Sequence, residues 1–386
     1  MVINDVTEFV RNGASIKQEK GCGGIPITRI ETIANSKFNY DRLGYANIYD
    51  DKYQDYYLKN DDVLLSHINS EKYLGRAVVY KQDTDKRIIH GMNLLCLRFI
   101  SSRYNPAYFC YYAQSDRAKM YISKNTKKSV NQASITATAI KNMPIPESSV
   151  EEQNNVVFRL DSVQSIIDLY YEQLKRLDEL IKSRFVEMFG DMIINPCEWN
   201  RNKLGKVCDV RDGTHDSPSY YDEGYPLVTS KNVTNGTINF SNCNCICEAD
   251  FNKINERSKV DIGDILMPMI GTIGKPVIVK TDKPFAIKNV ALIKFYPNSL
   301  VNNTYIHTIL KSDYFDRMVI SKIRGGTQRF IALGDIRELT ISIPPIEFQN
   351  QFADFVTQVE KQKATVQHSI DKLETLKKSL MQEYFG

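Results

Sequence analysis

Two stretches of the chain decide its fold: EEQNNVVFRLDSVQSIIDLYYEQLKRLDELIKSRFVEMFG (residues 151–190) and EFQNQFADFVTQVEKQKATVQHSIDKLETLKKSLMQEYFG (residues 347–386). Both belong to a longer repeat, in which residues 140–190 align with residues 336–386 without a gap. Identical pairs include Glu151/Glu347, Gln153/Gln349 and Asn154/Asn350. Each copy therefore places the same helical segment after a different globular segment.

The repeat continues more faintly through the rest of each half. Arg11-Asn12-Gly13 corresponds to Arg211-Asp212-Gly213, and Gly75 corresponds to Gly274. The period is far too long for a solenoid, so we expect two diverged globular units, each followed by a long helix. The predicted boundaries are a first domain at 1–146, a helix at 147–190, a second domain at 191–345 and a second helix at 346–386.

Both helices show the alternating steps of four and three residues that define a heptad seam. In the first helix the seam residues are Val156, Leu160, Val163, Ile167, Tyr170, Leu174, Leu177 and Ile181. In the second they are Phe352, Val356, Val359, Val366, Ile370 and Leu373. Lys363 and Lys377 occupy the seam positions that match Ile167 and Ile181, and a charged seam residue costs stability while restricting register.

One helix leads from the first globular unit to the second, and the other leads back. We therefore predict that they pair as an antiparallel coiled coil, with the units related by an approximate two-fold axis. Ser148 or Ser149 is the expected N-cap of the first helix, with acidic residues in its first turn and Gly190 at its end. The alternative is that each helix folds back onto its own domain as an ordinary core helix.

Each globular unit combines short strand signals with one helix. We expect strands within residues 60–66, 75–81, 93–99, 226–233, 263–269, 275–280 and 290–296, and helices at 105–123 and 303–322. The βαβ alternation of a doubly wound sheet is missing, so the fold class is α+β, built mainly on a curved sheet.

Length and composition are those of a soluble globular protein, with 386 residues, 42% hydrophobic and 25% charged. No apolar run is long enough for a membrane span and no signal peptide is visible, which predicts a cytoplasmic protein. The eight cysteines are scattered except for Cys243, Cys245 and Cys247. That run could hold zinc, but its spacing favours strand alternation, and we expect no metal site.

Basic residues are concentrated in the first unit, above all within residues 101–141. The basic side chains there are Arg103, Arg117, Lys119, Lys124, Lys127, Lys128 and Lys141, against Asp116 as the single acidic residue. The stretch is a candidate phosphate-facing surface. A solvated basic face without a partner would have the same composition.

Several motifs resemble the DNA specificity subunits of type I restriction-modification systems. They are RDGTHDSP (211–218), GDILMPMIGTIGKP (263–276), GGTQRFIALGDIRELTISIPP (325–345) and EFQNQF (347–352). The resemblance extends over the whole chain, although the first half has weaker versions, such as NQASITATAIKNM (131–143). In that family two target recognition domains alternate with two helical regions, which is the order that the repeat gives.

The resemblance implies a DNA-binding subunit of a DNA methylation complex. Each recognition domain would read one half of a bipartite, asymmetric site on double-stranded DNA, and the helices would set the gap. Two methyltransferase (modification) subunits would dock on the helical region, with separate restriction/translocase subunits when present. The chain itself would be non-catalytic and hold no cofactor, because S-adenosylmethionine, Mg and ATP would be bound by those partners. No membrane is implied.

Sequence motifs for catalysis within the chain are weak. Asn105-Pro106-Ala107-Tyr108 is similar to the Asn-Pro-Pro-Tyr signature of adenine methyltransferases, but the Gly-rich cofactor loop is missing. A capped helix start explains it better, because the matching position also begins with Asn302. GTIGKP (271–276) lacks the spacing of a phosphate loop. We name no catalytic residue.

DNA reading needs Lys and Arg for phosphates and Arg, Lys, Gln, Asn or Ser for base edges. In the first unit the candidates are Lys17, Arg29, Lys124, Lys127, Lys128 and Gln132. In the second they are His215, Ser217, Lys231, Lys322, Arg324, Gln328 and Arg329. Gln132 and Gln328 coincide in the repeat, so a structural or backbone-contacting role suits them better than discrimination between sequences.

A different class of function remains open, namely a scaffold or adaptor whose helical rod presents two divergent domains to proteins and not to DNA. Salt dependence separates the two hypotheses, because phosphate contacts make binding steeply sensitive to salt.

Overall fold

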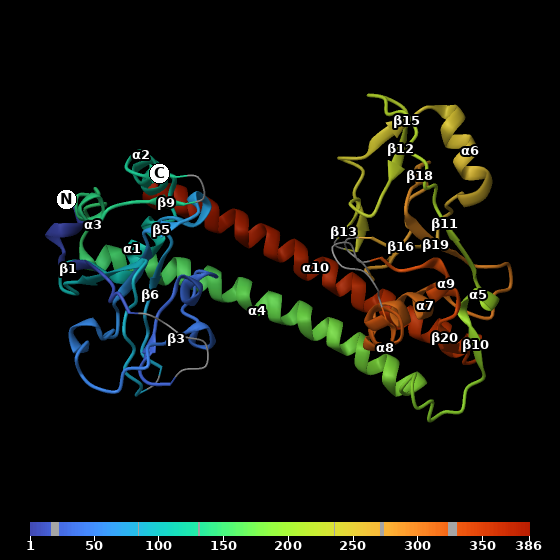
Figure 1. The fold of residues 1–386 in the computed structure, drawn as a ribbon, viewed down its shortest axis with the longest axis horizontal. Helices are drawn as coiled ribbons and strands as arrows, with labels where there is room; N and C mark the ends of the chain where they lie inside the picture. The colour runs from blue at the N-terminus through green and yellow to red at the C-terminus, as the bar shows by residue number, and fades with distance from the viewer. Residues whose placement is uncertain (17–22, 84, 130–131, 235, 271–273, 323–329) are drawn as a thin grey trace. The chain divides into compact units, whose positions relative to one another are not determined.

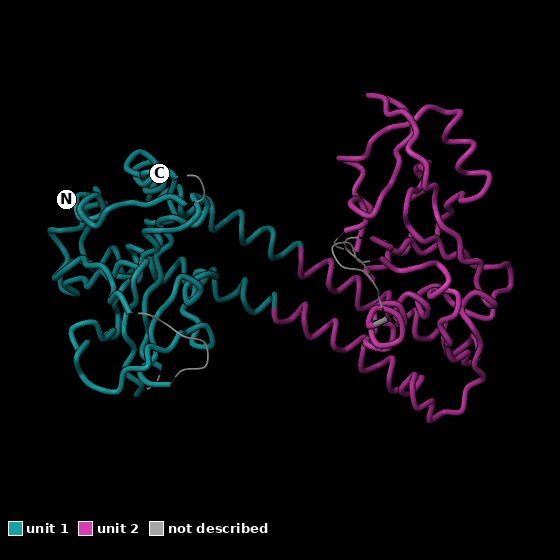
Figure 2. The backbone as a smooth tube through the Cα atoms, in the orientation of Figure 1, with its two compact units in different colours: residues 1–171, 368–386 teal, residues 172–367 magenta. Residues whose placement is uncertain are grey.

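The computed structural model describes residues 1–16, 23–83, 85–129, 132–234, 236–270, 274–322 and 330–386. They divide into two compact units, with residues 1–171 and 368–386 in unit 1 and residues 172–367 in unit 2 (Figure 2). Two helices of 40 residues, α4 (Val150–Phe189) and α10 (Ile346–Phe385), contribute to both units (Figure 1). Among the described residues, no helix combines the length and apolar character that a membrane crossing requires.

Unit 1 is built on an antiparallel four-stranded sheet in the order β1-β7-β4-β6. These strands are β1 (Thr7–Asn12), β7 (Leu94–Phe99), β4 (Val63–Ser66) and β6 (Ala77–Val79). Smaller pairings involve β2 (Pro26–Ile27) with β3 (Gly44–Tyr45), and β9 (Ala133–Ser134) with β5 (Ile68–Asn69) and β8 (Lys127–Lys128). The remaining elements are α1 (Pro106–Tyr112), α2 (Asp116–Lys124), α3 (Ala137–Lys141), η1 (Ile3–Asp5), η2 (Ile30–Ile33), η3 (Tyr40–Arg42), η4 (Gln54–Tyr56) and η5 (Glu71–Tyr73).

Unit 2 repeats this sheet in the order β11-β19-β16-β17. Its strands are β11 (Asp209–Asp212), β19 (Val290–Lys294), β16 (Ile265–Pro268) and β17 (Val277–Ile278). Smaller sheets join β15 (Asn244–Ile246), β12 (Tyr225–Val228) and β18 (Ala286–Ile287), then β13 (Val233–Thr234) to β14 (Thr237–Ile238), and β10 (Arg201–Lys203) to β20 (Thr340–Ser342). The helices are α5 (Leu204–Val207), α6 (Glu248–Ser258), α7 (Asn303–Leu310), α8 (Asp313–Met318), α9 (Leu333–Arg337) and the turn η6 (Ile320–Lys322).

The predicted α+β class with two repeated domains is therefore confirmed. Every predicted strand segment contains or overlaps an observed strand. The central strands β4, β7, β16 and β19 are apolar except near one end, because both sheet faces are covered. In β7, Leu95 and Leu97 belong to the core beneath the helices, whereas Leu94 and Cys96 belong to a second cluster on the opposite face.

The predicted helices at 105–123 and 303–322 are wrong in one respect, because each is broken. In unit 1 α1 ends at Tyr112 and α2 begins after Ser115, whose hydroxyl accepts a hydrogen bond from the Ala118 N–H at 3.2 Å. In unit 2 the break falls at the matching Ser312. A serine with an acidic residue after it is a common helix-start signal, and the helix is interrupted at such a serine in both units. The Ser312 hydroxyl, however, donates to Ile309 O at 2.6 Å and does not cap α8.

Local signals set the start and end of α4 as predicted. The Glu152 N–H donates to the Ser149 hydroxyl at 3.2 Å, and the Ser149 N–H donates to the Glu152 carboxylate at 2.8 Å. This reciprocal pair is a capping box, and the backbone hydrogen bond lowers the pKa of Glu152. Gly190 ends the helix with a φ of +75°, which glycine adopts without strain.

The two long helices pack together within each unit, and they do so antiparallel. In unit 1 Lys377 Nζ donates to Gln164 Oε1 at 2.5 Å, and Tyr171 OH donates to Glu374 Oε1 at 3.0 Å. In unit 2 Lys363 Nζ lies 2.8 Å from Asp178 Oδ1. Both seam lysines are thus matched to polar partners across the seam.

The seam residues named from the sequence are all buried or half-buried. The ends of the helices also join the core of a unit. Leu160 and Phe385 belong to the core of unit 1, and Phe185, Phe189 and Phe352 belong to that of unit 2. The two long helices therefore pair with each other and also pack, near their ends, against the globular part of each unit.

A buried glutamine anchors the start of each long helix to its unit. Gln153 Oε1 accepts from the Asn105 N–H at 2.7 Å, and Gln349 Oε1 accepts from the Asn302 N–H at 2.9 Å. Both glutamines are fully buried. The side chain of Gln153 also donates to Ser148 O, and that of Gln349 donates to Pro344 O. Each glutamine thereby satisfies backbone groups that helix and loop ends leave unpaired.

Candidate DNA-binding surface

The register of each main sheet brings loops from separate parts of the sequence to one end of the sheet. In unit 1 Asn12 at the end of β1 pairs with Leu95 at the start of β7, and Ser66 at the end of β4 pairs with Leu94. In unit 2 Asp212 pairs with Ala291, and Pro268 pairs with Val290. We call this end, where the first strand finishes and the long central strand begins, the loop end of each sheet.

At the loop end of unit 2, the segment before β19 holds two other segments by backbone hydrogen bonds. The Thr214 N–H donates to Ile287 O at 3.0 Å, and the Asn289 N–H donates to Thr214 O at 3.2 Å. The Lys288 N–H donates to Val228 O at 2.9 Å. The loop after β11 and the turn after β12 therefore meet at residues 287–289.

This convergence brings His215, Ser217 and Lys231 to one place. The Asn289 carbonyl accepts from the hydroxyl of Ser230, next to Lys231, at 3.3 Å. Lys288 Nζ donates to Ser217 Oγ at 2.6 Å. The side chains of His215, Ser217 and Lys231 are exposed. Three predicted contact residues from two chain segments thus share one solvent-facing surface.

His215 is tied into a charged network. Its Nδ1 lies 2.7 Å from Asn289 Oδ1, and its Nε2 lies 2.9 Å from Asp212 Oδ2. The other oxygen of Asp212 accepts a hydrogen bond from Arg257 in α6. The hydrogen bonds to Asn289 and Asp212 raise the pKa of His215 above its ordinary value of 6.5, against the opposing effects of burial and of Arg257.

The loop end of unit 1 uses the same backbone arrangement. The Ala14 N–H donates to His90 O at 2.9 Å, and the Met92 N–H donates to Ala14 O at 3.0 Å. Gly91 also donates its N–H to the hydroxyl of Thr28 at 2.9 Å. Arg29 follows Thr28 directly and is exposed, so it lies at this end. Lys17, three residues after Ala14, is outside the described residues.

A glycine follows the first strand in both units for a steric reason. A Cβ on Gly13 would collide with the carbonyl of Gly91, and a Cβ on Gly213 would collide with the carbonyl of Ile287. The close approach of two backbones requires the residue without a side chain. The glycine of the repeated Arg-Xaa-Gly therefore allows the loop end to form.

A second group of predicted residues lies on the β8–β9 hairpin of unit 1. Lys127 pairs with Ser134 and Lys128 with Ala133, while β9 also pairs with β5, which follows β4 at the loop end. Lys124 lies at the end of α2, just before the hairpin, and Gln132 lies between its two strands; all four side chains are exposed. Lys128 Nζ lies 2.8 Å from Glu71 Oε1. The Gln132 carbonyl accepts from the Ser129 N–H at 2.8 Å.

The matching region of unit 2 is only partly described. Arg324, Gln328 and Arg329 lie outside the described residues, as does the side chain of Lys322 at the end of η6. The chain re-enters at Phe330, which forms an antiparallel bridge with Ile270 just beyond β16. Residue 330 thus lies at the loop end of unit 2.

The basic stretch 101–141 does not form one surface. Arg103 lies beyond the opposite end of β7, where its guanidinium donates to the carbonyl of Asp5 at 3.1 Å. Lys127 and Lys128 lie on the hairpin that continues from the loop end. Proximity in the sequence therefore overstated this surface, and of its members Lys124, Lys127 and Lys128 lie toward the loop end.

The two motifs that could suggest a methyltransferase or a zinc site have structural explanations in the described residues. Asn105 caps α1 by accepting from the Ala107 and Tyr108 N–H groups at 2.8 and 3.2 Å. Cys245 lies in β15 opposite Pro226, between Cys243 and Cys247. Among the described residues, no group of three His, Cys, Asp or Glu side chains is arranged to hold a metal ion.

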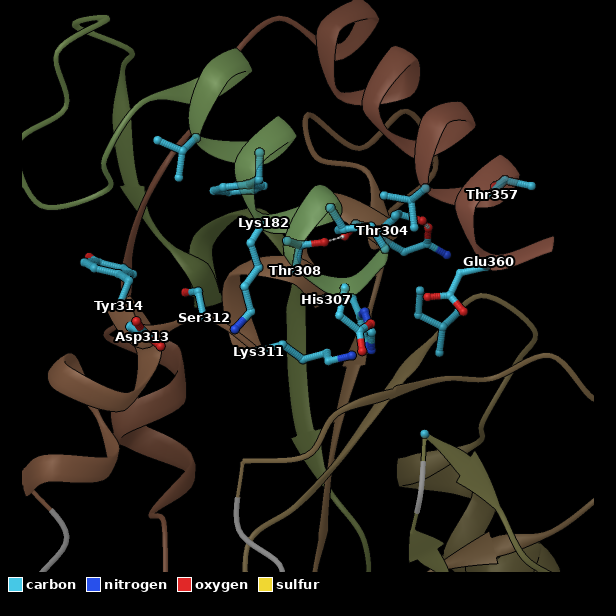
Figure 3. A pocket seen from close by; sticks show the side chains of 18 of the residues that line it. Lys182, Thr304, His307, Thr308, Lys311, Ser312, Asp313, Tyr314, Thr357 and Glu360 are labelled. Atoms are coloured by element: carbon cyan, nitrogen blue, oxygen red, sulfur yellow. Dashed lines mark hydrogen bonds between the residues drawn. The ribbon is translucent and has the colours of Figure 1, made fainter. Parts of the chain in front are cut away.

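A cleft of about 1180 Å³ lies in unit 2 between α7, α8 and parts of α4 and α10. Figure 3 shows Lys182 and Lys311 extending into it near His307. Burial, with the nearby Lys311 charge, lowers the pKa of His307 to about 4, so that ring is neutral near pH 7. None of the described DNA-contact candidates lines this cleft, which is therefore separate from the loop end.

Lys288 and Asn289 are the functional candidates that the sequence reading missed. They occupy the short connection between β18 and β19, which contains no motif. Asn289 has a φ of +55°, a left-handed conformation that asparagine tolerates better than most residues. Asn93 occupies the matching place in unit 1, with a φ of +81°. An asparagine at the same repeat position was the signal available from sequence.

Comparison with protein families gives a match in each half of the chain. A family model described as the type I restriction modification DNA specificity domain matches residues 1–179 and again residues 196–375.

Two curated proteins are similar over most of the chain. A protein of Methanocaldococcus jannaschii, provisionally named type I restriction enzyme MjaX specificity subunit, is 26% identical over 98% of this chain and 90% of its own length. The type I restriction enzyme EcoBI specificity subunit of Escherichia coli is 20% identical over 73% of this chain and 65% of its own length.

Solved structures show the same fold at low identity. The S subunit of a type I restriction-modification system from M. genitalium aligns with 100% of this chain and 95% of its own, with a TM-score of 0.57 and 11% identity. A chain from a study of complex assembly and conformational transition of a type I restriction-modification system gives a TM-score of 0.58 at 17% identity, over 100% of this chain and 96% of its own.

Proposed function

This chain belongs to the type I restriction-modification DNA specificity family, and we propose that it recognises a bipartite, asymmetric site on double-stranded DNA. Residues 1–146 would read one half-site and residues 191–345 the other. The observation that supports this most is that both units have the same loop-end backbone with different side chains. Asp212, His215 and Lys288 in unit 2 replace Asn12, Ser15 and Gly91 of unit 1. Reading two different sequences requires such a change of donors and acceptors on a constant support.

The exposed cations at the loop ends suit phosphate contacts. Lys124, Lys127 and Arg29 in unit 1 and Lys231 in unit 2 are exposed on short, well-anchored elements. His215 and Ser217 provide shorter polar side chains, which suit contacts to base edges. We assign the lysines to the positioning of the duplex and these shorter residues to sequence reading.

We propose that the helical region binds the methyltransferase subunits. In unit 1 the first half of α4 exposes Phe158, Ile166 and Leu169, with Phe158 at 72% and Leu169 at 63%. Phe158 and Leu169 are three helical turns apart, so they lie on one stripe of the helix. An exposed apolar stripe of this kind is typical of a protein interface. Methyl transfer with S-adenosylmethionine, and any Mg- and ATP-dependent cleavage, would then belong to the partner subunits.

Salt-dependent DNA binding tests the recognition role. The chain, purified with its methyltransferase subunits, is expected to protect two short sequences at a fixed separation in a footprint of duplex DNA. The affinity should fall steeply as salt rises, because bound phosphates release counterions. Binding that ignored both salt and DNA sequence would contradict the proposal and favour the scaffold alternative.

Leu169→Asp tests the docking of the methyltransferase. A charge on the exposed stripe should abolish copurification of the methyltransferase subunits and reduce DNA methylation by at least about tenfold, because an apolar interface position would become a buried charge. Copurification and methylation are measured side by side. Ser165→Asp adds the same charge one turn away without removing an apolar side chain. This control variant should still copurify with the methyltransferase subunits and support DNA methylation. Full methylation by the Leu169→Asp protein would place the interface elsewhere.

A further inference from the structure

Resting on the proposed function, we propose that unit 2 reads its half-site with a doubly protonated His215, so that recognition of this half-site alone weakens as pH rises. His215 would act as a DNA-contacting cation that also holds the loop in place.

The hydrogen-bond partners of the ring determine its protonation state. Asp212 accepts from Arg257 through Oδ1, and its other carboxylate oxygen, Oδ2, acts as an acceptor toward the ring. The ring atom that faces Oδ2 at 2.9 Å, Nε2, must therefore carry hydrogen. Nδ1 faces Asn289 Oδ1 at 2.7 Å, and an amide oxygen also only accepts. With hydrogen on both nitrogens, His215 is an imidazolium ion.

The ring bridges the segments that form the loop end. Asn289 is fixed from the opposite side, because its N–H donates to Thr214 O and its carbonyl accepts from Ser230. A neutral ring has one donor and would lose one of its two anchors. The side chain of His215 is still 63% exposed, so its charge faces the solvent beside Lys231 and Lys288. Deprotonation would remove both a cation and a loop contact.

The groups around His215 shift its pKa in opposite directions. Asn289 and Asp212 raise the pKa by accepting hydrogen bonds from the ring, whereas burial and the Arg257 charge lower it. The outcome is a pKa above the ordinary 6.5. A base with a raised pKa stays charged below that value and loses its charge as pH rises through it. The charged form, and with it DNA binding, therefore declines as the pH rises above 6.5.

Unit 1 lacks this chemistry on the same backbone. Ser15, Asn12 and Gly91 occupy the positions of His215, Asp212 and Lys288, and none of them has a side chain that titrates in this range. Asn93, directly before β7, has the left-handed conformation that Asn289 has directly before β19. The pH dependence should therefore be confined to one half-site.

The test measures affinity for duplex DNA at constant salt, from pH 6.0 to 8.5, with the chain in its methyltransferase complex. Three duplexes are compared: the full site, one with the half-site of unit 1 scrambled, and one with the half-site of unit 2 scrambled. The half-site of unit 2 is the one that persists when residues 1–140 are replaced. We expect an affinity loss of about tenfold over this range wherever the half-site of unit 2 is intact, and a flat profile where it is scrambled.

Variants separate a pH-sensing contact from a structural one. His215→Gln should bind the half-site of unit 2 weakly and equally at every pH, and Lys231→Gln should lower affinity at all pH values while keeping the slope. Ser15→Gln, at the matching position of unit 1, should leave the slope unchanged. A flat wild-type profile, or a slope that survives in His215→Gln, would overturn the proposal. Loss of all sequence discrimination in the wild type would instead reject the proposed function itself.

Discussion

At the residue scale, the two units share a buried ion pair at matching positions. In unit 1 Arg98 donates from Nε and Nη2 to Asp62, both at 2.7 Å, and Asp62 is 1% exposed. In unit 2 Lys294 Nζ lies 2.5 Å from Asp264 Oδ2, and Asp264 is also buried. Each aspartate additionally accepts a backbone N–H three residues before it. The pair closes the end of the sheet opposite the loop end, so its role is structural.

Substitution of Arg98 should show this role. Arg98→Met leaves the Asp62 carboxylate buried without its partner and should lower the free energy of unfolding by about 3 kcal/mol. Arg98→Lys copies the residue found in unit 2 and should recover most of the loss. Urea unfolding of both variants at pH 7.5 gives the comparison. Equal stability of the two variants would show that the pair contributes little.

Acid should destabilise unit 2 through His307. Burial lowers the pKa of His307 to about 4, and its Nε2–H donates to Pro276 O at 3.0 Å. A folded pKa below the unfolded value of 6.5 means that the unfolded state binds more protons as pH falls, so stability is present above pH 6.5 and is lost toward pH 4. Lowering the pH from 7.5 to 5.5 should reduce the free energy of unfolding by about 1 kcal/mol through protonation of this group.

The variant His307→Gln isolates this contribution. Gln keeps a donor for Pro276 O but cannot take up a proton. Urea unfolding at both pH values should show a smaller acid-induced loss for this variant than for the wild type. The same loss in both proteins would mean that other groups account for the acid sensitivity.

At the element scale, apolar periodicity predicted the helices well and local polar signals decided where they break. The seam spacing gave α4 and α10 and their pairing because a heptad pattern has few structural solutions. The interruptions at Ser115 and Ser312 were missed because the apolar pattern continues across them. The strands β10 and β20 were also missed, since neither has an alternating pattern long enough to be recognised.

Gln153 and Gln349 anchor the starts of α4 and α10, and replacing either glutamine should lower the stability of the protein. Gln349→Ala would leave the Asn302 N–H and the carbonyls of Leu300 and Pro344 without a partner, which should cost about 2–4 kcal/mol. Gln153→Ala should have a similar effect in unit 1. Thermal or urea unfolding measures both losses. The exposed Gln351→Ala is the control and should be neutral; a neutral Gln349→Ala would refute the anchoring role.

At the scale of the whole molecule, the sequence repeat alone predicted two related units and two long helices. The candidate DNA surface was only partly predictable. His215, Ser217 and Lys231 come together because strand register brings separate loops to one end of a sheet, and register is not visible in residue types. Lys288 and Asn289 were missed for the same reason. Arg103 shows the opposite error, since neighbours in sequence were assigned to one surface that the sheet separates.

The central claim is that each unit reads its own half of a divided DNA site. The most direct measurement is to map modified adenines in cells that contain the methyltransferase partner and a chain in which residues 1–140 come from another specificity subunit. The account predicts that one half of the modified sequence changes while the other half, read by the retained unit 2, stays the same. A modified sequence in which both halves remain unchanged would contradict it.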